Sequence, residues 1–145
     1  MAMRRNLLIV ALGITFLILM TWLGTVLTSI IPHQVTAQEQ TVRVGPYQLT
    51  LQVNPNPPLI TQPAALSIRV LSAGTQQPIT NASVTLEGAM VEMEMSTDKV
   101  EARAQGDGTY LANVQFSMSG FWKVHVIVAV PGAAPVSTDF EVTAQ

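Results

Sequence analysis

The alternation that decides the fold reads YQLTLQV and runs from Tyr47 to Val53. Every second side chain in it is apolar, and the side chains between them are glutamine or threonine. A period of two is typical of a β-strand with one buried face, because successive side chains of a strand point to opposite faces. A proline-rich turn at residues 54–58 follows. The stretch therefore predicts a half-buried strand that ends at this turn.

Similar alternation recurs along the rest of the chain, with turn residues at short and even spacing. It predicts further strands over residues 64–71, 83–87, 89–95, 100–104, 109–116, 120–130 and 136–142. No helical pattern separates them. The pattern is typical of an all-β antiparallel sandwich of two sheets with an immunoglobulin-like layout. The chain has no cysteine, so the disulfide of antibody domains is absent and the likeness is one of layout only.

The inward-facing positions of these strands form the predicted core. They are Leu49, Leu51, Ile68, Val70, Val84, Leu86, Tyr110, Val114, Phe116, Trp122, Val124 and Val126. The same strand phase places Met93, Met95 and Met118 in the core and turns His125 outward.

An uncharged run from Leu7 to Ile31 precedes the sandwich and directly follows Arg4 and Arg5. As a helix it would reach about 37 Å, which is enough to cross a hydrocarbon layer of about 30 Å. The sequence therefore predicts a single transmembrane helix. Because the basic residues near this segment precede it, residues 1–31 form a cytoplasmic N-terminus and anchor, and the remainder lies outside, in a periplasmic or extracellular space.

A cleaved signal peptide is the alternative to an anchor. Val35-Thr36-Ala37 offers small residues where a signal peptidase cuts, so that the mature chain would begin at Gln38. Signal peptides carry an apolar stretch of only about 7–15 residues. The longer run in this chain favours an uncleaved anchor.

Beyond the anchor, residues 32–40 are polar and predict a linker, and residues 41–145 predict one domain. All nine acidic residues of the chain lie beyond Ile31, together with five of the seven basic residues. The basic residues are scattered rather than clustered. Nucleic acid is therefore excluded as the expected partner.

Five motifs occur in an ordered series through the domain. They are Gly-Pro-Tyr at 45–47, a proline-bearing loop at 55–63, a methionine-rich segment at 90–95, Gly-Thr-Tyr at 108–110 and Met-Ser-Gly-Phe-Trp at 118–122. In this order they resemble the YtkA-like domains, which are related in layout to the FixH proteins. The resemblance implies a small extracytoplasmic domain, often membrane-anchored, associated with copper handling or with the assembly of respiratory oxidases. One departure is Val91, because the family often has proline after the first methionine.

The segment that resembles the family contains candidate ligands for copper. Cu(I) prefers thioether sulfur, with or without an imidazole, where no thiolate is present. Met93, Met95, Met118 and His125 form the candidate metal site, with copper as the implied cofactor. The competing interpretation is that these methionines fill the core, because alternation puts His125 on the opposite face.

Catalysis is not expected from this sequence. His125 lies between two valines with no acidic residue nearby in the sequence, so a nucleophile activated by a histidine and a carboxylate has no visible basis. A zinc site would need ligands beyond the two histidines of the chain.

The sequence therefore predicts a non-catalytic accessory or interaction subunit of a membrane complex of respiratory type. A Cu(I)-binding accessory protein is the alternative, and a ligand-binding module of enzyme-like type ranks last. Small polar side chains at Thr21, Thr25 and Ser29 lie four residues apart in the predicted anchor. They would allow close packing against the helices of an integral membrane partner, although such hydroxyls also bond within their own helix.

Overall fold

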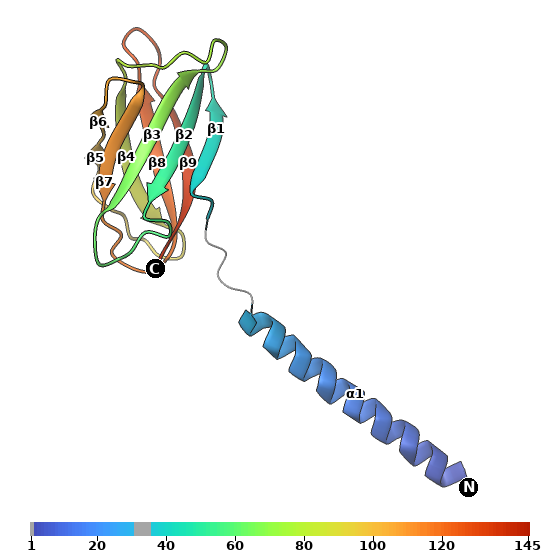
Figure 1. Cartoon of the computed structure of the whole chain (residues 1–145). Coiled ribbons are helices and arrows are strands. Elements are labelled where there is room, and N and C mark those ends of the chain that lie inside the picture. Colours follow the sequence, from blue (N-terminus) through green and yellow to red (C-terminus); the bar gives the residue numbers. More distant parts are fainter. Residues whose placement is uncertain (1, 31–35) are drawn as a thin grey trace. The chain divides into compact units, whose positions relative to one another are not determined.

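The computed structural model describes residues 2–30 and 36–145 and, within the helix, the side chains of Asn6 and residues 9–23. The chain forms two compact units, Met1–Gln34 and Val35–Gln145. The first contains one helix, α1 (Ala2–Ile30), and the second consists of β-strands (Figure 1).

The described side chains of α1 at residues 9–23 are all exposed. The hydroxyl of Thr21 donates a hydrogen bond of 2.8 Å to the carbonyl oxygen of Leu17. It therefore bonds within its own helix, whereas the side chains of Thr25 and Ser29 lie outside the described ones. In the described part of the chain, no helix is both long and apolar enough to cross a membrane.

The second unit is a sandwich of two antiparallel sheets, as predicted. The five-stranded sheet has the order β1-β2-β3-β7-β6 and consists of β1 (Glu39–Val44), β2 (Tyr47–Asn54), β3 (Ala64–Ser72), β7 (Thr109–Val114) and β6 (Arg103–Ala104). The four-stranded sheet has the order β5-β4-β8-β9 and consists of β5 (Val100–Glu101), β4 (Ser83–Met90), β8 (Gly120–Ala129) and β9 (Val136–Ala144).

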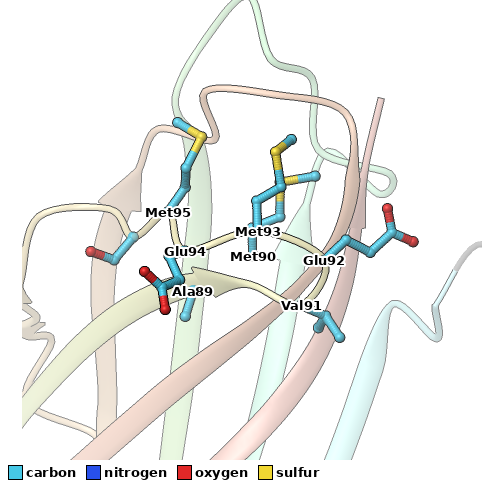
Figure 2. A pocket seen from close by; sticks show the side chains of 8 residues that line it. Ala89, Met90, Val91, Glu92, Met93, Glu94 and Met95 are labelled. Carbon is cyan, nitrogen blue, oxygen red and sulfur yellow. The ribbon is translucent and has the colours of Figure 1, made fainter.

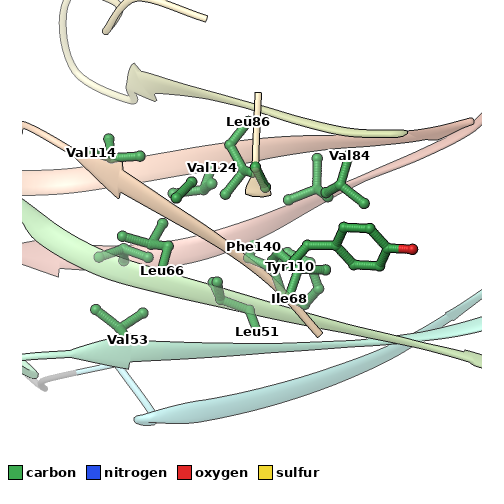
Figure 3. Packing of buried hydrophobic residues seen from close by; sticks show 14 of the residues in the cluster. Leu51, Val53, Leu66, Ile68, Val84, Leu86, Tyr110, Val114, Val124 and Phe140 are labelled. Atoms are coloured by element: carbon green, nitrogen blue, oxygen red, sulfur yellow. The ribbon is translucent and has the colours of Figure 1, made fainter. Parts of the chain in front are cut away.

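The core lies between the inner faces of the two sheets. All twelve residues predicted for it are buried, and each exposes 1% or less of its surface. Figure 3 shows side chains of one sheet, such as Leu51 and Ile68, meeting Val124 and Phe140 of the other. Burial of this size is the main stabilising contribution in a domain without disulfides.

The predicted strand over residues 89–95 does not form. β4 continues through Gly88 to Met90, and the chain then turns over residues 91–95. Gly88 lies within the strand and does not end it. A Cβ at this position would lie 3.1 Å from Cγ2 of Thr97, so the glycine leaves room for that side chain.

One further strand prediction was inaccurate, and one strand was missed. The predicted strand over 100–104 divides into β5 and β6, which pair with different sheets, so the chain crosses between the sheets at Ala102. Strand β1 was not predicted, because it is only half buried and its apolar residues are limited to Val42 and Val44.

Both lateral edges of the sandwich are short or bridged. On one side the edge strands β5 and β6 have two residues each. On the other side the amide of Gln40 in β1 bonds the carbonyl oxygen of Glu141 in β9, and its Oε1 accepts a bond of 3.4 Å from the Glu141 N–H. This side chain therefore joins the edges of the two sheets.

Candidate functional site

The methionine-rich segment forms a tight turn after β4, which we call the methionine loop (residues 91–95). The N–H of Met90 donates to the carbonyl oxygen of Met95 at 2.8 Å, and the N–H of Val91 donates to that of Phe121 at 3.0 Å. The first bond closes the loop and the second attaches it to β8. The loop is therefore held by its backbone, and its side chains are left to the surface.

The exposure of the methionine side chains is the opposite of what the predicted strand phase requires. Met93, Met95 and Met118 expose 46%, 39% and 39% of their surfaces, whereas Met90 exposes 7%. The prediction that the first three fill the core is therefore wrong. For Met93 and Met95 the physical cause is the turn at Val91, and for Met118 it is the end of β7 at Val114; each ends the alternation on which the phase depended.

The side chains of Met90, Met93 and Met95 line an open hollow of about 550 Å³ formed by residues 89–96. In Figure 2 the side chains of Met93 and Met95 rise on the same side of the loop, whereas the carboxylates of Glu92 and Glu94 point elsewhere. The loop thus presents thioethers and carboxylates in different directions.

The loop between β7 and β8 brings Met118 to the same end of the sandwich. Met90 pairs with Trp122 across β4 and β8. The indole Nε1 of Trp122 in turn donates to the carbonyl oxygen of Met118 at 3.0 Å. The structure therefore brings three of the four predicted ligands, Met93, Met95 and Met118, to one end.

The fourth predicted ligand, His125, lies elsewhere. It is three residues beyond Trp122 on β8, or roughly 10 Å along the strand. It points outward, as predicted, and its Nδ1 lies 2.6 Å from Oδ1 of Asp139. The structure therefore separates the imidazole from the methionines, and the Cu(I) site stays a prediction. The linker residue His33 lies outside the described residues.

Asp139 is a neighbour of His125 that was not predicted from the sequence. It pairs directly with His125 across the β8–β9 hairpin, and Glu87 pairs with His125 on the other side. Counting outward from the Pro131-Gly132 turn could have revealed the first pair. Among the described residues, no three His, Asp or Glu side chains are grouped so that they could hold a metal ion.

Further apolar side chains are exposed at the same end of the sandwich, which we call the methionine end. It consists of the methionine loop, the β7–β8 loop (115–119), the start of β8 and the loop after β2 (55–63). Its large exposed apolar side chains are Leu59, Ile60, Val91, Met93, Met95, Met118 and Phe121. Large exposed apolar surfaces on a protein commonly mark contact sites.

The residues just before β1 are also bonded to the sandwich at this end. The carbonyl oxygen of Thr36 accepts a bond of 2.9 Å from Asn56 Nδ2, and its hydroxyl accepts a bond of 3.2 Å from the N–H of Thr143. The carbonyl oxygen of Gln38 accepts a bond of 3.1 Å from the N–H of Val53. The exposed apolar side chains therefore share one end with the start of the domain.

Comparison with known proteins bears on the fold and the family. The model of a family described as YtkA-like matches residues 41–127. No curated protein matches the chain.

The solved structures that resemble the chain include the following two. One is a DUF4426 family protein from Pseudomonas aeruginosa, with a TM-score of 0.55 and 16% identity over 73% of this chain and 94% of that one. The other is FetP of uropathogenic E. coli, expressed in the periplasm, with a TM-score of 0.56 and 12% identity over 77% of this chain and 97% of that one. At these identities the likeness concerns the fold alone.

Proposed function

The chain belongs to the YtkA-like family, and we propose that it is a membrane-anchored, extracytoplasmic accessory subunit that binds an integral membrane protein of a respiratory-type complex without catalysing a reaction. The single observation that carries this proposal is the concentration of exposed apolar side chains at the methionine end.

The proposed anchor is the uncharged run from Leu7 to Ile31, which follows Arg4 and Arg5. Its described side chains at residues 9–23 are exposed on all sides. A helix that is apolar all round needs apolar surroundings, which a bilayer provides. The two arginines favour a cytoplasmic N-terminus and an extracytoplasmic sandwich.

The length of chain between anchor and domain supports docking close to the membrane. Thr36 is six residues beyond Ile30, and six residues span at most about 22 Å. Since Thr36 is bonded into the methionine end, a partner embedded in the same membrane would lie within reach of the exposed methionines.

The absence of catalysis is proposed from the surroundings of His125. Its partner Asp139 exposes 52% of its side chain, and His125 exposes 42%. A histidine and a carboxylate on an open sheet face lack the enclosed and shaped surroundings that catalytic groups require. The methionine hollow is open as well, and the carboxylates of Glu92 and Glu94 in its lining are exposed, so it too lacks such surroundings.

Co-purification of the full-length chain from membranes tests this function. The chain would be extracted in mild detergent, and the proteins bound to it would be identified by mass spectrometry. The variant Met93→Gln/Met95→Gln/Met118→Gln should lose an integral membrane protein that the native chain retains. The matched control is Leu111→Gln, because Leu111 is also 39% exposed but lies on β7, away from this end. Equal recovery with both variants would contradict docking through the methionine end.

Cu(I) binding is the second candidate function. It is favoured by three exposed thioethers at one end of a chain without cysteine. A Cu(I) competition assay on the full-length chain tests it. The variant Met93→Leu/Met95→Leu/Met118→Leu should lose the metal, and His125→Ala should retain it if the thioethers suffice. A native chain that takes up no Cu(I) would end this alternative.

A further inference from the structure

We propose that Met93, Met95 and Met118 form an oxidation switch: in the unbound chain, peroxide converts their thioethers to sulfoxides and thereby prevents the partner from docking on the methionine end. This inference rests on the proposed docking function. It adds a modification site and a means of regulation to that surface.

The four methionines of the domain differ sharply in access to a dissolved oxidant. Met93, Met95 and Met118 expose between 39% and 46% of their surfaces, whereas Met90 exposes 7%. The Cε of Met90 lies where a Cβ on Gly120 would approach to 2.7 Å, so this thioether is packed against the backbone of β8. Susceptibility of methionine follows exposure, and Met90 therefore serves as an internal reference.

The fold would survive oxidation of the three exposed thioethers. The methionine loop is held by the backbone bonds from Met90 N–H to Met95 oxygen and from Val91 N–H to Phe121 oxygen. Met118 contributes only its carbonyl oxygen to the bond with Trp122. Because no thioether takes part in these bonds, oxidation changes the surface and leaves the scaffold in place.

The reaction needs no group from the protein other than the thioether. A lone pair of the sulfur attacks one oxygen of hydrogen peroxide, the O–O bond breaks, and the second oxygen leaves as water after proton transfer. The sulfur is oxidised by two electrons and the peroxide is reduced by two. The chain has no cysteine to compete for the oxidant.

The product changes the chemistry of the docking surface. A sulfoxide is a strong hydrogen-bond acceptor, and burying it against an apolar partner without a donor is costly. Glu92 and Glu94 lie on the same loop, but their carboxylates point away from the thioethers. Three sulfoxides would therefore place strong acceptors among the remaining exposed apolar side chains, which are Leu59, Ile60, Val91 and Phe121.

Graded treatment of the detergent-extracted full-length chain with hydrogen peroxide tests the switch. Peptide mass spectrometry should show Met93, Met95 and Met118 oxidised at least about tenfold faster than Met90. Recovery of the membrane partner should fall as these three react, and methionine sulfoxide reductases should restore it. The variant Met93→Leu/Met95→Leu/Met118→Leu keeps an apolar surface. It should therefore bind the partner, and peroxide should not change the amount of partner recovered.

Three outcomes would contradict the proposal, and each leads to a different conclusion. Oxidation of Met90 at the same rate would overturn the argument from access. Selective oxidation with unchanged partner recovery would overturn the switch and leave the docking function standing. A native, untreated chain that recovers no membrane protein would overturn both.

Discussion

The indole Nε1 of Trp122 donates a hydrogen bond of 3.0 Å to the carbonyl oxygen of Met118. The Trp122 ring is fully buried and meets Phe116 edge to face, with ring centroids 5.4 Å apart at 69°. The backbone of Met118 is thereby fixed by the core, while its side chain is exposed. A buried aromatic residue thus positions part of the proposed docking surface.

Replacing Trp122 with alanine should destabilise the domain by about 3–5 kcal/mol, because it leaves a cavity and removes this hydrogen bond. Denaturant unfolding of the full-length chain in detergent, followed by near-ultraviolet circular dichroism, measures the change. Phe121→Ala is the control, since the neighbouring ring is 40% exposed and should cost less than about 1 kcal/mol. Similar costs for the two variants would contradict the burial of Trp122.

Tyr110→Phe should destabilise the domain by roughly 1–3 kcal/mol. The Tyr110 hydroxyl donates to the carbonyl oxygen of Ile79 at 2.7 Å and accepts from the N–H of Ala82 at 2.9 Å. Its removal leaves two backbone groups without partners. In Tyr47→Phe the lost hydroxyl makes no hydrogen bond within the described residues, so the same unfolding measurement should detect little change.

Gly108→Ala should cost roughly 2–5 kcal/mol, because strain and overlap add at this position. Gly108 has a φ of +83°, and a Cβ there would lie 2.5 Å from Cβ of Pro78. Gly106→Ala separates the two effects: its φ is +90°, but no atom lies within 4 Å of the added Cβ. Thermal unfolding of both variants should show the smaller loss for Gly106→Ala, and the reverse order would show that the contact with Pro78 is absent in solution.

Asp107 should titrate below the usual range of an aspartate. The backbone N–H of Thr109 donates to its Oδ1 at 3.0 Å, and this bond, followed by one from the Thr109 side chain, lowers the pKa of Asp107. A depressed folded-state pKa contributes stability that is present above the unfolded value of about 3.9 and is lost as pH falls through the folded value. The carboxyl carbon shift measured against pH tests this. Thr109→Val should raise the pKa only in part, because the backbone bond remains.

The core was predictable because its signal is local. Side chains such as Leu49, Leu51 and Val124 alternate with polar neighbours, and a strand fixes the direction of each by its period of two. The sequence also predicted that His125 faces outward, since β8 is regular from Gly120 to Ala129.

The candidate site was harder to predict because a turn interrupts the period. Met90 to Met95 alternates like a strand and contains no glycine, proline or asparagine to mark the turn at Val91. What makes the turn is a set of bonds to distant partners, such as that from the Val91 N–H to the Phe121 oxygen. Contacts between strands, including that of His125 with Asp139, depend on the register in which the strands pair. A single sequence specifies this register only indirectly.

Gln40 bridges β1 and β9 on one side of the sandwich, and the edge strands on the opposite side have two residues each, so neither side offers a long free strand edge. Unpaired strand edges are the usual templates for edge-to-edge polymerisation and amyloid growth. Here one edge is occupied by a side chain and the other is too short to extend a sheet. The sandwich therefore gains resistance to edge-to-edge aggregation from a single glutamine and from a segment of chain that changes sheets at Ala102.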